Sequence, residues 1–124
     1  MTETSKQYFI GEEHLEGITR SANPFTFKGQ VIGLPFHLEE LINKYDKYVI
    51  PKSRGIYHLF YRDRLVYVGM SKNLRNRLLN HLGNVNMPFD CVLWFCMKNR
   101  TIENILRIET NMIKLFQPPL NEKI

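Results

Sequence analysis

The sequence predicts an α+β fold in which a small three-stranded antiparallel sheet is flanked by helices. Two runs rich in β-branched and aromatic residues, 55–61 and 65–69, are close enough along the chain to form a hairpin. A third run, 91–97, is apolar on both faces and precedes a long segment with helical periodicity. The 124 residues suit one domain. We expect residues 54–124 to form this domain and residues 1–53 to form an N-terminal extension.

The N-terminal extension contains one clear helix signal, over residues 36–45. Its apolar residues follow the spacing of one helix face, at Leu38, Leu41, Ile42 and Tyr45. Pro35 suits the first turn of this helix, where a missing N–H leaves no hydrogen bond unmade. The sequence therefore predicts a short helix ahead of the sheet.

The turn of the hairpin is predicted from the polar gap 62–64, which reads Arg-Asp-Arg. The gap has neither Gly nor Asn to supply the positive φ that a two-residue hairpin turn prefers. We therefore expect a longer loop with an odd number of residues. Because strand side chains alternate between faces, an odd loop places Tyr57 and Tyr67 on the same face of the hairpin.

A short helix is predicted directly after the hairpin, over residues 74–82. Ser71 or Asn73 can cap its N-terminus, and leucines form its apolar stripe. Arg77 and His81 are four residues apart, so they form a polar row beside that stripe.

The last helix is predicted to follow Thr101, whose side chain can cap it. Its apolar face is formed by Ile102, Ile105, Leu106, Met112, Ile113 and Phe116. Glu109 falls in the middle of that face, where a carboxylate is costly unless it is paired or holds a metal ion. Two interpretations are open: an ion pair with Arg77 or Arg107, or a ligand of Mg²⁺, which binds carboxylate oxygens and keeps most of its waters.

Charge is unevenly distributed along the chain, whose net charge is +5. Residues 1–50 carry five Lys or Arg and seven Asp or Glu, whereas residues 51–124 carry twelve and five, a net charge of +7. Such a basic region favours polyanionic partners. No apolar stretch approaches the ~20 residues of a membrane span, the N-terminus lacks a secretory signal, and only two cysteines are present. We therefore expect a cytoplasmic protein without membrane contact.

Two tripeptides of the predicted hairpin resemble a known family. Gly55-Ile56-Tyr57 and Tyr67-Val68-Gly69 are similar to the paired motif that names the GIY-YIG nuclease family. Val68 replaces the commoner Ile, and the nine residues between the two tyrosines are on the short side for the family. The first difference is a conservative exchange, and the second only shortens a hairpin loop.

Four further residues continue the resemblance, which covers residues 54–121. Arg77 stands where the family has an arginine in the next helix, and His81 stands where a histidine often follows. Glu109 lies in the later helix that carries the family's metal-binding glutamate. Asn121 follows a Pro-containing loop, as the family's terminal asparagine does.

The resemblance implies an endonuclease that hydrolyses phosphodiester bonds of DNA with one Mg²⁺ or Mn²⁺ ion per active site. The active site would lie on the sheet face that carries both tyrosines. Tyr57 would activate water and pass its proton to His81, while Arg77 would hold the scissile phosphate. Glu109 would bind the metal ion, and Tyr67 would hydrogen-bond the phosphate or the water.

Other residues are implied to bind DNA or to support the site. Lys72 and Arg75 would contact backbone phosphates, which determine affinity more than sequence choice. Arg54 and Arg64 are further candidates for such contacts, and Asn121 would buttress the site.

The closing segment, 113–121, looks most like the restriction and phage endonuclease II-like branches of the family. We therefore expect a stand-alone restriction, phage or mobile-element nuclease, with double-stranded DNA as the favoured substrate and single-stranded DNA as the second. Because such enzymes commonly pair subunits to cut both strands, we also expect a homo-oligomer. Two alternatives are a non-catalytic or structure- or single-strand-specific nucleic-acid-binding module of the same fold, and a basic protein-interaction or inhibitor domain.

Overall fold

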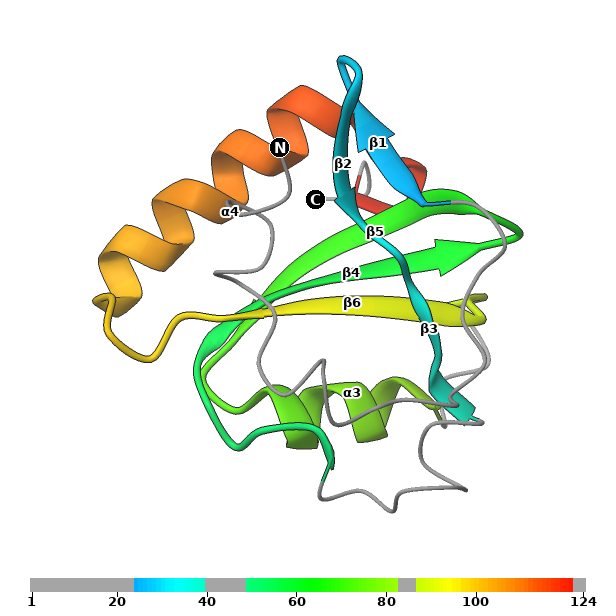
Figure 1. Cartoon of the computed structure of the whole chain (residues 1–124). Helices are drawn as coiled ribbons and strands as arrows, with labels where there is room; N and C mark the ends of the chain where they lie inside the picture. Colours follow the sequence, from blue (N-terminus) through cyan, green and yellow to red (C-terminus); the bar gives the residue numbers. More distant parts are fainter. Residues whose placement is uncertain (1–23, 40–48, 83–86, 122–124) are drawn as a thin grey trace.

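The computed structural model describes residues 24–39, 49–82 and 87–121. Its centre is an antiparallel sheet of four strands in the order β3-β6-β4-β5. These strands are β3 (Phe36–His37), β4 (Gly55–Tyr61), β5 (Arg64–Ser71) and β6 (Cys91–Cys96). Helix α3 (Leu74–Leu82) lies on one side of the sheet and α4 (Ile102–Phe116) on the other (Figure 1). The α+β class is confirmed, with one short strand more than the three predicted.

A second, two-stranded sheet precedes this one and was not indicated by the sequence pattern. It is the hairpin of β1 (Phe25–Phe27) and β2 (Gln30–Gly33). Its turn places Lys28 and Gly29 at positive φ. The ring of Phe25 packs edge-on against that of Phe116, with centroids 5.2 Å apart. This contact ties the hairpin to the C-terminal end of α4.

The helix predicted over residues 36–45 begins only at Leu38, and residues 40–48 lie outside the described residues. Phe36 and its neighbour pair with β6 as strand β3. The reason is burial, because the Phe36 ring is 2% exposed and stacks on that of Trp94 at 5.5 Å. Helical spacing alone did not reveal that this ring has a partner in the sheet.

The turn between β4 and β5 has two residues, so the prediction of a longer, odd-numbered loop is wrong. Arg62 and Asp63 both adopt positive φ, 51° and 68°, although neither is Gly or Asn. Tertiary contacts stabilise this conformation. The backbone N–H of Arg62 donates to the carboxylate of Asp90 at 3.3 Å, and the Arg62 guanidinium lies over the ring of Tyr61.

A β-bulge nevertheless keeps both tyrosines on one face, as predicted. Leu59 lies opposite Tyr67, whereas Phe60 lies opposite Leu65, so β5 has one extra residue at this point. The extra residue reverses the alternation that a two-residue turn would impose. Tyr57 and Tyr67 therefore both point to the side of α3.

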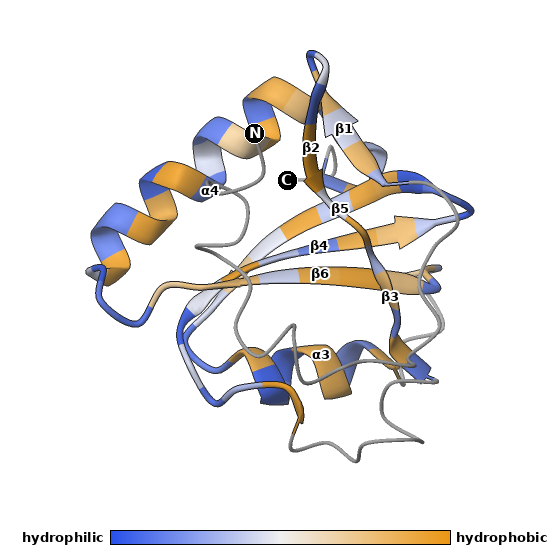
Figure 2. Cartoon of the chain, viewed as in Figure 1, coloured by the Kyte–Doolittle hydropathy of each residue, from blue (hydrophilic) through white to orange (hydrophobic). Residues whose placement is uncertain are grey.

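Alternation along β4 divides the core into two layers. Tyr57 and Leu59 pack in the layer that contains the leucines of α3. Ile56 and Phe60 point the opposite way and pack in the layer that contains α4. Figure 2 shows the hydrophobic residues of the central strands enclosed between the two helices, while α4 alternates hydrophobic and hydrophilic bands.

Helix α4 begins and packs largely as expected. Thr101 caps it by accepting a hydrogen bond from the backbone N–H of Asn104 at 3.1 Å. Leu106 does not join the apolar face as predicted, because it is 45% exposed, and Ile108 packs against the sheet instead. No helix of the described residues is long and apolar enough to cross a membrane.

His58 is buried in the layer that contains α4. Its ring lies 4.8 Å from that of Phe95 and 5.8 Å from those of Phe25 and Phe116, and its Nε2 lies 3.4 Å from the sulfur of Met112. Its Nδ1 has no hydrogen-bond partner within the described parts of the chain. Burial lowers the pKa of His58 to about 3, so the imidazole is neutral in the folded protein.

We predict that His58 makes the protein sensitive to acid. Its pKa is about 3 in the folded chain and 6.5 in the unfolded chain, so below pH 6.5 the unfolded chain binds a proton that the folded chain does not. The free energy of unfolding should therefore fall by up to about 1.4 kcal/mol per pH unit as the pH drops from 6.5 towards 3. Urea unfolding of the parent and of His58→Leu at several pH values measures this slope.

Phe60→Leu provides the control, because it changes the same buried cluster without removing an imidazole and should keep the slope of the parent. Parallel pH profiles for the parent and His58→Leu would contradict the prediction.

Candidate active site

Tyr57 and Tyr67 come from neighbouring strands, and their ring centroids lie 6.0 Å apart. Tyr57 is 1% exposed, and Tyr67 is half-buried. Gly69 lies directly opposite Tyr57 in the sheet. A Cβ at position 69 would overlap the phenol of Tyr57 and would come within 2.8 Å of the Tyr67 ring. Glycine at this position is therefore what allows the two rings to meet.

His81 at the end of α3 completes a hydrogen-bonded pair with Tyr57. The phenol oxygen lies 3.0 Å from Nε2 of His81, which is 8% exposed. Burial, together with Tyr67, raises the pKa of Tyr57 above its usual value, whereas Arg77 opposes this rise. Burial, helped by Arg77, lowers the pKa of His81. At neutral pH the pair is therefore a phenol beside a neutral imidazole, and the phenol can donate to Nε2.

Glu109 reaches the same place from α4, on the other side of the sheet. Burial raises the pKa of its carboxyl, and a hydrogen bond from the backbone of Met70 opposes that rise. Its charge also raises the pKa of Tyr57, so the two groups interact electrostatically. Within the described segments, no ion pair joins Glu109 to Arg77 or Arg107. The structure therefore does not support the ion-pair interpretation.

The open edge of β5 brings the two sides of the site together. β5 is the outer strand, so the backbone groups on its far side lack a neighbouring strand. The Asn121 side chain accepts a hydrogen bond from the N–H of Val68 and donates one to its carbonyl, both at 2.9 Å. Glu109 interacts with the backbone of Met70, two residues further along. The candidate residues thus lie around this edge and are not confined to the sheet face that carries both tyrosines.

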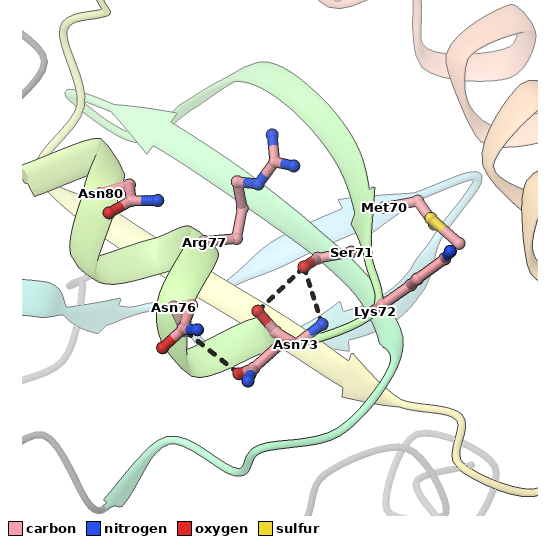
Figure 3. Close-up of a pocket in the computed structure, with 7 residues that line it drawn as sticks. All are labelled: Met70, Ser71, Lys72, Asn73, Asn76, Arg77 and Asn80. Atoms are coloured by element: carbon pink, nitrogen blue, oxygen red, sulfur yellow. Dashed lines mark hydrogen bonds between the residues drawn. The ribbon is translucent and has the colours of Figure 1, made fainter.

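A pocket of about 370 Å³ opens beside Arg77, between the end of β5 and α3 (Figure 3). It is lined by Met70, Ser71, Lys72, Asn73, Asn76, Arg77 and Asn80. Asn73 caps α3, because its Oδ1 accepts a hydrogen bond from the backbone N–H of Asn76 at 3.2 Å. Ser71 fixes that cap by bonding to the backbone N–H and carbonyl of Asn73 at 2.9 and 2.8 Å. Arg77 is exposed, so its guanidinium is accessible at the pocket.

The four basic residues proposed to bind DNA lie in different places. Lys72 is exposed at the pocket. Arg64 begins β5, about 26 Å from Lys72 at ~3.3 Å per strand residue. The guanidinium of Arg54 donates to the carbonyl of Arg100 at 3.0 Å, and Nε of Arg75 donates to that of Ile50 at 2.7 Å. The structure brings only Lys72 of these four to the pocket beside Arg77.

A divalent cation fits the chemistry of this site. In the described parts of the chain, no three His, Cys, Asp or Glu side chains gather in a metal-binding group. Glu109 is the carboxylate at the β5 edge that could hold such an ion. Mg²⁺ suits this arrangement, because it is commonly held by one or two carboxylates and keeps several waters.

Asn76 and Asn80 are not among the site residues predicted from the sequence. They lie on α3 on either side of Arg77 along the chain, and both line the pocket. A signal was available, because asparagine is a weak helix former and two of them occur in a helix of nine residues.

Comparison with known proteins shows partial similarity along the sequence. No family model matches the chain. The UvrABC system protein C of Borrelia duttonii is 30% identical over 95 residues, which are 71% of this chain and 15% of that protein. The protein of the same name from Rickettsia bellii is 34% identical over 80 residues, 58% of this chain and 12% of that protein. The chain therefore spans at most about 15% of the length of these two relatives.

The fold is similar to that of a solved domain. This is the GIY-YIG N-terminal endonuclease domain of UvrC from Thermotoga maritima, described as bound to its catalytic divalent cation, magnesium. The TM-score is 0.51 at 20% identity, over 61% of this chain and 91% of that domain. A tyrosine-to-phenylalanine variant of the same domain gives the same TM-score. The predicted resemblance to the GIY-YIG family is therefore confirmed.

We predict that Gly69→Ala destabilises the protein by displacing Tyr57. The new methyl group would occupy the space of the Tyr57 phenol, and such overpacking typically costs about 1–3 kcal/mol. The same exchange in a Tyr57→Leu background should cost less, because the overlapping phenol is gone and only the close contact with the Tyr67 ring remains. Urea unfolding of the four proteins forms a double-mutant cycle. Equal costs in the two backgrounds would show that the contact with Tyr57 is not the reason for glycine.

Proposed function

We propose that this chain, which has the GIY-YIG fold, is a divalent-metal-dependent endonuclease that hydrolyses phosphodiester bonds of DNA. The observation that carries the proposal is the 3.0 Å contact between the Tyr57 phenol and His81, with Arg77 and Glu109 in electrostatic reach of the phenol. The described function of the Thermotoga maritima domain, an endonuclease with a catalytic divalent cation, supports it.

The Tyr57–His81 pair would activate the attacking water. Tyr57 is a phenol at neutral pH, so it can accept a proton only while it gives up its own. Its proton passes to Nε2 of His81, which is free to accept it because the lowered pKa keeps the imidazole neutral. The water proton moves to the phenol oxygen, the water oxygen bonds to phosphorus, and the bond from phosphorus to the leaving sugar oxygen breaks.

Arg77 and Tyr67 would position the phosphate. The guanidinium of Arg77 is exposed and can bind two phosphate oxygens at once through its planar set of donors. Its charge opposes the rise of the Tyr57 pKa, which favours loss of the phenol proton. It also lowers the pKa of His81, which keeps the imidazole neutral but makes it a weaker proton acceptor. The half-buried Tyr67 lies near enough to the Tyr57 ring to hydrogen-bond the phosphate or the water.

Glu109 would hold one Mg²⁺ or Mn²⁺ ion, and Asn121 would fix the strand on which the site depends. The bound ion would supply positive charge that neutralises the phosphate and the leaving oxygen. Asn121 is 6% exposed and bonds only to backbone in the hydrogen bonds described, so we assign it a positioning role.

Several finer expectations stay predictions. Double-stranded DNA remains the favoured substrate, and Lys72 is the basic residue best placed to contact its backbone. The restriction, phage or mobile-element type, the homo-oligomer, the cytoplasmic location and the division at residue 53 remain expectations from the sequence. The cytoplasmic expectation drew on the low number of cysteines, and both of them, Cys91 and Cys96, are free thiols.

We predict that Glu109→Gln abolishes metal-dependent cleavage. The amide keeps the size of the side chain and removes the charge that would bind the ion, so nicking of plasmid DNA with Mg²⁺ should fall at least about 100-fold. Glu103→Gln, at an exposed position in the first turn of the same helix, is the matched control and should cleave like the parent.

If the parent itself does not cleave DNA in Mg²⁺ or Mn²⁺, the proposal fails. Binding that weakens steeply with salt would then favour the non-catalytic nucleic-acid module. Absence of both cleavage and DNA binding would favour the protein-interaction domain.

We predict that cleavage depends on pH through His81. The imidazole must be neutral to accept the phenol proton, and its pKa lies below 6.5, so the rate should be flat near neutral pH and fall only below pH 6.5. Saturating Mg²⁺ keeps protonation of Glu109 from causing the same fall. His81→Phe should lower kcat about 10²- to 10⁴-fold and remove this acidic fall. A His81→Phe variant with the rate and pH profile of the parent would contradict the role of the imidazole.

A further inference from the structure

The pocket beside Arg77 is lined by cationic, amide, hydroxyl and thioether side chains. Its lining has two cationic side chains, Lys72 and Arg77, and no carboxylate. Of the other five lining residues, four carry an amide or a hydroxyl, and the fifth is Met70. Its volume of about 370 Å³ lies within the usual range of small-ligand pockets. An anion with hydrogen-bonding groups attached therefore fits it better than a bare anion.

The asparagine side chains of the pocket are not explained by the helix that carries them. Asn73 is used as the cap of α3. Asn76 and Asn80 are exposed. Within the described segments, Asn76 donates a hydrogen bond to the Asn73 side chain through its backbone N–H and not through its amide. Alanine at either position would be a better helix former by about 0.5 kcal/mol. Helix stability thus gives no reason for asparagine at these two positions.

The position of Asn76 and Asn80 relative to Arg77 sets what they could contact. They are one helical turn apart, about 6 Å along the axis at 1.5 Å per residue, with Arg77 between them in sequence. Figure 3 shows Asn76 and Asn80 on α3, across the view from Met70 and Lys72 at the end of β5, and all four line the pocket. A strand whose phosphate lies on Arg77 would therefore place its neighbouring nucleotide between these amides and the end of β5.

We propose that this pocket binds the nucleotide next to the scissile phosphate, and that Asn76 and Asn80 hydrogen-bond the edge of its base. The inference rests on the proposed function, since it takes Arg77 as the phosphate-binding residue. An amide has both donors and an acceptor, which match base edges, whereas phosphate oxygens only accept. Lys72 contacts the backbone on the opposite wall, and Met70 packs against the sugar or the base.

The test measures DNA binding in EDTA, so that binding is recorded without cleavage. The probes are a fluorescein-labelled 20-nucleotide DNA, as duplex and as single strand, and a chain of the same length whose phosphates link abasic tetrahydrofuran units. The Asn76→Ala/Asn80→Ala variant should bind the base-containing DNA about tenfold more weakly than the parent. Its affinity for the abasic chain should stay within about twofold of the parent, because phosphate contacts are unchanged.

Two controls separate base reading from loss of structure. Asn111→Ala removes an exposed asparagine of α4 that does not line the pocket, and it should bind both probes like the parent. Circular dichroism should show that the double variant keeps its helix content, because alanine favours helix at both positions. Equal weakening for both probes, or unchanged binding of both, would overturn the proposal.

Failure of this proposal and failure of the proposed function are distinguishable. Cleavage of plasmid DNA by the parent in Mg²⁺ tests the function. If the parent cleaves and the double variant shows no base-dependent loss of binding, only the base contact is wrong. If the base-dependent loss is found and the parent does not cleave, the pocket stands and the nuclease assignment falls.

Discussion

Between Leu59 and Phe60, the pairing of β4 with β5 shifts by one residue, and this shift decides on which face of the sheet Tyr67 lies. A two-residue turn without it would send Tyr67 to the side of α4, away from Tyr57. With the bulge, Val66 and Tyr67 both pack in the layer that contains α3. The Tyr57–His81 hydrogen bond lies on this side of the sheet, and so does α3, which carries Arg77. The site therefore depends on one extra residue in a strand.

The unpaired edge of β5 explains how a carboxylate from the opposite side of the sheet joins that site. An edge strand must satisfy its outward backbone groups with something other than another strand. Here the Asn121 side chain forms hydrogen bonds with both the N–H and the carbonyl of Val68, and Glu109 interacts with the backbone of Met70. The two side chains come from segments distant in sequence from β5. The same edge thus holds the C-terminal turn η3 (Pro119–Asn121) and presents Glu109 near the tyrosines.

Burial determines the protonation states with which the site works. It raises the pKa of Tyr57 and of Glu109 and lowers that of His81, so each group is biased towards its neutral form. The exposed Arg77 is the nearby cation that acts on both members of the Tyr57–His81 pair. The proposed binding of a phosphodiester together with a metal ion would add an anion and a cation to this largely neutral set of groups.

Local patterns in the sequence were sufficient to predict the helices over 74–82 and after Thr101, the β4–β5 hairpin, and the place of Glu109 in an otherwise apolar helix face. These features depend on spacing and on capping residues within a few positions of one another. The six site residues stay a prediction from their motifs. The structure shows Tyr57 beside His81, and it shows Asn121 and Glu109 at the backbone of β5.

Tertiary structure alone decided the rest, because the deciding contacts join residues far apart in sequence. Positive φ at Arg62 is supported by Asp90, and strand β3 forms because Phe36 stacks on Trp94. Nothing near residue 60 in sequence indicates the bulge, which replaces the predicted odd loop. The sequence by itself determined which chemical groups the site has. Burial and the open edge of β5 determined which of these groups come into contact and in which direction their pKa values shift. Neither burial nor an open strand edge is a local property of the chain.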